Sequence, residues 1–349
     1  MKTTFTSTAA ISEATRLTMA RLQSQLSDAQ KEVSTGRHAD VGLALGSRTG
    51  QTVSLRQEQT RLQAMMDSNS IVSTRLDASQ STLTNIATGA QSFLNQLTAA
   101  PNSTIQNILQ TEATSSLSSL IGSLNTQVNG AYLFAGINAD VKPVADYYEA
   151  GSPNRQAVVN AFTTAFGFPP TDPQVANISA AAMETFLNGP FANLFTDTAW
   201  KADWSSASDQ DVRSRISTTE LIDTSTNAND VSFRKLASAY TMLADLGTAS
   251  LSKTAFQKVV DKATALTSEA IRGLTDLQVG LGDAQKRVSD ANDRMSLQSD
   301  IMTTHIGALE GIDPYEASSR LSELMTQVET AYAITARIQK LSLLNYLAP

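Results

Sequence analysis

Cysteine is absent from this sequence of 349 residues, and histidine occurs only as His38 and His305. Disulfides and thiol chemistry are therefore excluded, and a zinc site nearly so, because zinc in proteins is held mainly by Cys and His. The sequence also contains no Walker phosphate-binding loop, no G-x-S-x-G and no H-E-x-x-H. We therefore expect no metal, no cofactor and no catalytic residue, and we predict that the protein is not an enzyme.

The two histidines and the acidic pairs are interpreted as structural. His305 follows Met302 on an apolar heptad stripe, so we expect a packed or half-exposed core residue rather than a general base. His38 lies in a polar stretch and is expected to face solvent. Pairs of acids such as Asp290 and Asp293 are typical of solvated helix faces.

Concentrated positive charge and long apolar runs are missing as well. The net charge is −7 and Lys and Arg are scattered, which argues against a nucleic-acid partner. No run of about 18 apolar residues occurs, so we expect no insertion into a membrane. The opening MKTTFTSTAAIS lacks the apolar segment of a secretory signal peptide, so any export is expected to proceed without a cleaved signal.

The sequence contains long heptad repeats. From Leu62 onward two apolar heptad positions can be read without a shift. One is occupied by Leu62, Asn69, Leu76, Leu83, Ala90 and Leu97, and the other by Met65, Val72, Ser79, Ile86 and Phe93. Pro101 predicts the end of this helix, and a second helix is expected from about Ile105 until Asn129-Gly130 stops it.

The far part of the chain repeats this pattern. One heptad position is occupied by Leu274, Leu281, Val288, Met295, Met302 and Leu309, and the other by Leu277, Ala284, Ala291, Gln298, His305 and Ile312. Pro314 is expected to interrupt before a final helix, and an earlier helix is predicted from about Ser232 to Ile271. The stripes are narrow, so the helices should pack side by side. The sequence predicts a mainly α fold with long antiparallel bundle or coiled-coil arms from both termini; periodicity alone does not separate this from a plain soluble helical bundle.

The middle of the chain differs in composition. Most of the prolines lie between residues 143 and 190, and aromatic residues gather between Tyr132 and Trp204. Because proline breaks helices and aromatic side chains build compact cores, we interpret residues 138–230 as an inserted α+β domain. Short helices are expected at 174–187 and in AVVNAFTTAF, whereas the positions of its strands are not predicted.

Three stretches carry a resemblance to a known family. STGRHAD, residues 34–40, resembles the Ser-x-Gly-Arg signature near the start of flagellins and flagellin-like hook-associated proteins. NGAYLFAG, residues 129–136, is similar to the segment that closes the family's first helical hairpin, which implies a β-hairpin near the insertion. Residues 316–347 are similar to the family's carboxy-terminal helix, down to the Leu-Leu-x-Tyr-Leu close.

The resemblance also implies how the chain is divided. Residues 1–44 and 310–349 are expected to be terminal assembly helices, disordered in the monomer and ordered on assembly. Residues 45–137 and 231–309 would form the helical core domain, and 138–230 the variable insertion. Ordering costs about 1 to 2 kcal/mol per residue, so the ends need several neighbours to fold. We assign the assembly interface to Ile11, Leu22, Leu26, Val33, Leu324, Val328, Ile338, Leu341, Leu344 and Leu347.

The implied function is structural, with alternatives open. The stretch AYAITARIQKLSLLNYL, residues 331–347, resembles the hook-associated members more closely than filament flagellin, which implies a self-assembling subunit that joins the bacterial hook to the filament. Filament flagellin is the alternative, followed by an adhesin-like binding module or a carboxylate-dependent hydrolase within residues 138–230. The implied partners are copies of itself, other hook-associated proteins and flagellin, with an export chaperone as a further candidate. The implied location is the extracellular flagellum.

Overall fold

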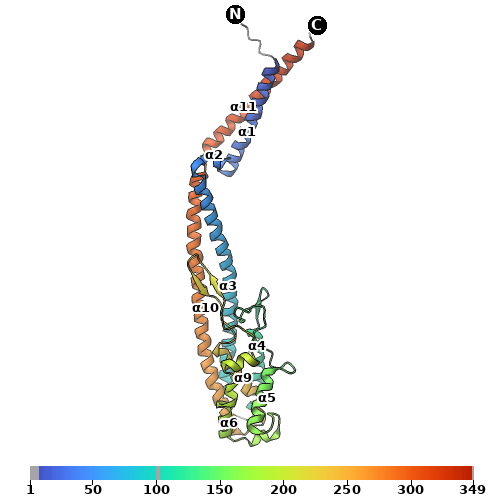
Figure 1. Ribbon diagram of the computed structural model, residues 1–349, viewed down its shortest axis with the longest axis vertical. Helices are drawn as coiled ribbons and strands as arrows, with labels where there is room; N and C mark the ends of the chain where they lie inside the picture. Colours follow the sequence, from blue (N-terminus) through green and yellow to red (C-terminus); the bar gives the residue numbers. More distant parts are fainter. Residues whose placement is uncertain (1–7, 100–102, 348–349) are drawn as a thin grey trace. The chain divides into compact units, whose positions relative to one another are not determined.

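The computed structural model describes residues 8–99 and 103–347, which form two units (Figure 1). One unit contains the residues up to Ala64 and those from Arg294 onward, and the other contains Met65–Asp293. The segment from 138 to 230 lies within the second unit, so its status as a separate domain stays a prediction, as do the other predicted boundaries.

Two long helices, α3 (Thr49–Thr98) and α10 (Lys253–Glu310), run antiparallel. Side-chain hydrogen bonds join the two helices in both units. Residues later in α3 pair with residues earlier in α10, as antiparallel helices do. These pairs are Gln59–Thr303, Asn69–Asn292, Asp77–Gln285 and Thr84–Gln278. The predicted antiparallel arms are confirmed.

The predicted heptad positions match the buried residues well in α3 and only partly in α10. All six residues of the first α3 position are buried, from Leu62 to Leu97. In α10 the stripe is buried from Leu274 to Met295, but the side chain of His305 is exposed. The expectation of a packed or half-exposed core histidine is therefore wrong, because Ile306 takes the buried position beside it.

A second helical pair is formed by α1 (Thr8–Thr35) and α11 (Pro314–Leu347). The two helices pack along each other and also run antiparallel, since Gln23 Nε2 donates to the Tyr332 hydroxyl at 2.8 Å and Arg320 pairs with Glu32 at 3.4 Å. Between α1 and α3 lie a short helix, α2 (Val41–Leu45), and the 3₁₀ turn η1 (Gly46–Arg48).

In the second unit, α3 is followed by helix α4 (Ser103–Leu124). A hairpin of β1 (Gln127–Val128) and β2 (Ala131–Tyr132) comes next. The hairpin near the insertion is confirmed, but the helix ends at Leu124 rather than at Asn129-Gly130. Those two residues both have positive φ, 53° and 79°, which suits the two-residue turn of a β-hairpin.

The inserted segment is mainly helical. Its helices are α5 (Pro153–Phe166), η2 (Pro173–Asn177), α6 (Ala180–Asn188), α7 (Pro190–Asn193) and α8 (Asp197–Asp203), and its strands β3 (Arg213–Arg215) and β4 (Leu221–Asp223) pair antiparallel. AVVNAFTTAF lies in α5 as predicted. The Ala-rich helix starts later than residue 174, because Ser179 caps α6 by accepting from the Ala182 amide.

The helix predicted from Ser232 to Ile271 is two helices. α9 (Val231–Asp245) ends before the turn η3 (Thr248–Ser250), and α10 begins at Lys253. Gly247 explains the break: its φ is +65°, and a Cβ there would lie 2.4 Å from the Pro170 carbonyl oxygen. A glycine is therefore required where the chain passes this close to another backbone.

Candidate functional site: the terminal helices and their joint

The terminal helices are connected to α3 and α10 through what we call the joint, residues 36–40 and 310–313. His38 N donates to the Glu310 carbonyl at 3.0 Å and Ile312 N to the Gly36 carbonyl at 3.2 Å, which flank an antiparallel bridge between Arg37 and Gly311. Gly36 has a φ of 68°, so the glycine of the Ser-Thr-Gly-Arg stretch supplies the turn that brings the two connections together.

A buried carboxylate fixes the joint. The Glu310 side chain is 2% exposed and lies against two arginines. Arg56 binds it through both Nε, at 3.0 Å from Oε1, and Nη2, while Arg37 Nη1 lies 3.7 Å from Oε2. The hydrogen bond from Arg56 and the charges of both arginines hold the pKa of Glu310 below its usual value, although burial acts in the opposite direction.

Changing Glu310 to Gln is expected to loosen the joint. The variant loses the charge-assisted pair, and because both arginines stay partly solvated the expected cost is about 1 to 2 kcal/mol of local opening free energy. In the assembled state, where the terminal helices are expected to be ordered, hydrogen exchange of peptides containing the His38 and Ile312 amides should become about tenfold faster. In the unchanged protein this stabilisation is present at neutral pH, above the ordinary carboxyl pKa of about 4.3, and is lost as the pH falls through the lowered pKa.

A matched control uses a carboxylate that takes no part in the joint. Glu58 pairs with Arg61 one helical turn away at 2.5 Å, so Glu58→Gln should leave exchange at the joint almost unchanged. Equal exchange in Glu310→Gln and the unchanged protein, or an unaltered acid response in that variant, would show that Glu310 does not hold the joint.

The structure places the predicted interface residues on the α1–α11 pair in three groups. Leu324 and Val328 are buried, Leu22 and Leu26 are half-buried, and Ile11 and Val33 are exposed. Helix α11 continues to Leu347, but the side chains of Ile338, Leu341, Leu344 and Leu347 lie outside the described residues. Assignment of all ten to an assembly interface stays a prediction.

Sequence reasoning missed other apolar side chains that this pair leaves in solvent. They are not among the residues that the sequence assigns to the assembly interface. They are Leu17, Met325, Tyr332 and Ile334.

A hollow of about 310 Å³ in the second unit tests the binding-module alternative. Arg155 and Asp245, which line it, are paired with each other: the Arg155 guanidinium binds Asp245 at 3.0 and 3.1 Å, and the Tyr147 hydroxyl donates to the same carboxylate at 3.0 Å. Arg155 also lies 5.7 Å from the centre of the Tyr148 ring. These contacts fasten α5 to the end of α9, which is a structural role.

The comparisons with known proteins decide the family. The bacterial flagellin N-terminal helical region matches residues 6–139 and the bacterial flagellin C-terminal helical region matches residues 264–347, together more than half of the chain. The chain belongs to the flagellin family. It is a non-enzymatic structural subunit of the extracellular bacterial flagellum, and flagellin-family chains assemble into flagellar polymers.

A solved structure shares the fold of this flagellin-family chain. A solved chain assigned as a flagellar hook-associated protein from Vibrio parahaemolyticus aligns with a TM-score of 0.52 and 10% identity, covering 75% of this chain and 97% of that one. No curated protein matches the chain. Within the residues that the structure describes, no helix is long and apolar enough to cross a membrane. The same residues contain no group of three or more His, Cys, Asp or Glu side chains that could hold a metal ion.

Proposed function

We propose that this flagellin-family subunit joins the hook to the filament. The observation that carries the proposal is the carboxy-terminal stretch AYAITARIQKLSLLNYL, residues 331–347, which resembles that of hook-associated members more than that of filament flagellin. The fold shared with the Vibrio hook-associated protein over nearly all of that chain is consistent with this role. Its partners would be copies of itself, other hook-associated proteins and flagellin, with an export chaperone during secretion.

In this role the terminal helices act through ordering on assembly. The α1–α11 pair exposes apolar side chains such as Leu17 and Ile334, so part of its apolar surface is left for neighbouring copies to cover. We infer that residues 1–44 and 310–349 are disordered in the monomer and fold when several neighbours supply that cover. Contacts that repeat head to tail do not close as a dimer does, and they build a ring or a helical tube.

A junction subunit differs from filament flagellin in its neighbours. It meets hook-type subunits on one side and flagellin-type subunits on the other, so its axial faces need not be complementary to each other. A few kcal/mol per contact is enough to stop self-extension. Purified protein is therefore expected to form no long filaments, even when its own fragments are added as seeds, as observed by electron microscopy.

Deletion of the gene tests the same proposal in cells. Cells that lack the protein should still build hooks but release flagellin into the medium, and a plasmid copy should restore filaments. Long homopolymers in the test tube, together with loss of the main filament band on deletion, would assign the chain to filament flagellin instead.

A further inference from the structure

We propose that each copy grips the next at the joint, where Tyr315 of one copy enters a basic hollow beside Arg37 and Arg56 of another. The inference rests on the assembly of copies in the proposed function, and it names the surfaces that meet. We call the hollow the socket and the segment Asp313–Glu316 the knob.

The socket is a hollow of about 580 Å³ between the end of α1, α2 and the start of α3. Its positive charge comes from Lys31, Arg37 and Arg56, and Val41 and Val53 provide apolar walls. Glu310 is the only carboxylate among the described residues that line it, and it is already held by both arginines. The socket therefore keeps excess positive charge beside an apolar wall.

The knob has the opposite character. Tyr315 is 89% exposed, the highest value among the exposed large apolar side chains of the described residues, so the ring is unused within its own chain. Its backbone is fixed, because Tyr315 N donates to Asp313 Oδ1 at 2.8 Å and Pro314 occupies the first turn of α11. Two carboxylates, Asp313 and Glu316, lie close to Tyr315 in the sequence, and Glu316 also pairs with Arg320 at 2.8 Å.

The chemistry of the two surfaces is complementary. A guanidinium attracts the face of a tyrosine ring, and Tyr is favoured in protein interfaces because an apolar ring and a polar hydroxyl share one side chain. The carboxylates beside Tyr315 would face Lys31 and the arginines, which selects the orientation of the ring. The knob of another copy, an aromatic residue with acidic neighbours, therefore suits the socket.

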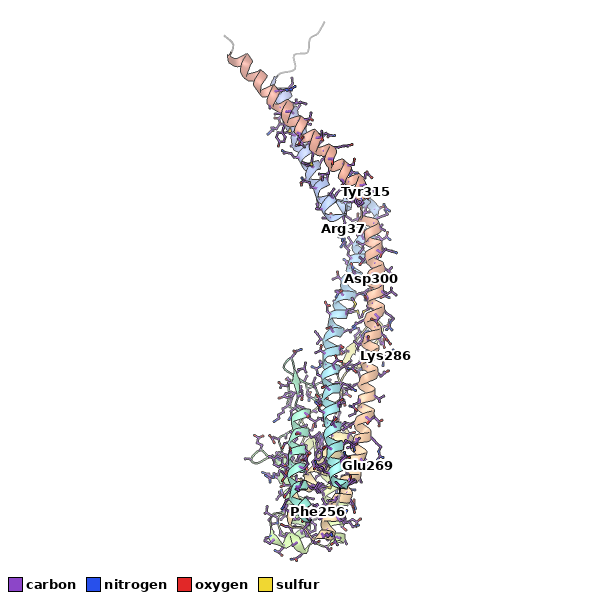
Figure 2. All side chains as sticks on the ribbon, turned by 180° about the vertical axis from the view of Figure 1, so that it is seen from behind. Arg37, Phe256, Glu269, Lys286, Asp300 and Tyr315 are labelled. Carbon is purple, nitrogen blue, oxygen red and sulfur yellow. The ribbon has the colours of Figure 1, made fainter. Side chains whose placement is uncertain are left out.

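The contact must join different copies. Tyr315 is almost fully exposed, so it does not fill the socket of its own chain, although it follows the joint by only two residues (Figure 2). Because knob and socket are different surfaces, the contact is heterologous, and each copy can use its knob on one neighbour and its socket on another. Repetition gives a closed ring or a tube rather than a dimer.

Cysteine pairs test the contact directly, since the chain has no cysteine of its own. We combine Tyr315→Cys with Val53→Cys, an exposed position in the socket wall, in one full-length chain and oxidise the assembled flagella. A heterologous contact predicts a ladder of disulfide-linked multimers on a non-reducing gel, whereas each single variant should run as monomer. A disulfide forms only when the two Cα atoms come within about 7 Å.

The matched control replaces Val53→Cys with Val279→Cys, an exposed valine of the second unit, and should give no ladder. No ladder from assembled Tyr315→Cys/Val53→Cys protein, or an internal disulfide in the monomer, would overturn the proposal. Dimers from the single Tyr315→Cys variant would also overturn it, because they would show a symmetric contact.

A second measurement decides the case if the double variant does not assemble. Tyr315→Phe keeps the ring and should be incorporated normally, whereas Tyr315→Ala should lower the copies per flagellum about tenfold. Equal incorporation of both variants would contradict the knob. Absence of the unchanged protein from purified flagella would instead refute the proposed function, so the two failures are distinguishable.

Discussion

Replacement of Leu341, Leu344 and Leu347 together by Ser is expected to abolish incorporation of the protein into flagella while leaving its export intact. The three leucines lie in the last turns of α11, which runs helical to Leu347. Burial of each leucine against a neighbour contributes roughly 1.5 to 3 kcal/mol, and the loss is repeated in every copy. Quantitative blots should find the variant in the medium and not in sheared flagella.

The control changes polar residues of the same turns. Lys340→Ser, Ser342→Ala and Asn345→Ser together keep all three leucines, so this variant should be incorporated at the normal level. The comparison separates loss of the apolar face from a general effect of mutating the helix end. Normal, motile flagella built by the triple leucine variant would show that this end of α11 is not the assembly element.

The long helices could be predicted from sequence because their burial repeats every heptad. Even the polar exception fits: Asn69 is fully buried at a heptad position where Leu predominates. Its side-chain amide donates to Asn292 at 2.8 Å and to the Ile216 carbonyl at 2.9 Å. The amide nitrogen is thus satisfied although Oδ1 is not, and a buried Asn that pairs across two helices favours one register over the others.

The breaks between elements could not be predicted because their causes are distant in sequence. Gly247 ends the α9 region through its close approach to Pro170, and no local pattern reports that approach. The hairpin was implied by resemblance, yet the Asn129-Gly130 pair was interpreted as a helix stop, because a left-handed turn serves both purposes.

The joint was visible in the sequence only in part. The Ser-Thr-Gly-Arg stretch resembles a family signature, but its physical role depends on Glu310, far along the chain. Arg56 lies 254 residues from Glu310, and neither residue belongs to a recognisable motif. Folding brings the three charges together, so only a structure explains why an arginine follows the turn glycine.

Trp200 lies in the core of the second unit, and its replacement is expected to have a large effect on stability. This side chain is 0% exposed, stacks on Trp204 with ring centres 5.0 Å apart, and donates from Nε1 to the Ala228 carbonyl at 3.2 Å. Trp200→Ala should lower the free energy of unfolding by about 3 to 5 kcal/mol. Urea unfolding followed by near-ultraviolet circular dichroism measures the change at the tryptophans, and far-ultraviolet circular dichroism measures it at the helices.

Both signals are expected to shift together, because the insertion is tied to the helices around it. Tyr147 stacks on Trp204 and donates to Asp245 of α9, and Asn125 at the end of α4 exchanges two hydrogen bonds with Val144. Trp200→Phe serves as the control: it keeps an aromatic ring and should lose less stability than the alanine variant. If the tryptophan signal shifted alone while the helices unfolded as before, residues 138–230 would be a separately folding domain. Coincident transitions would instead make them one cooperative unit with α4 and α9.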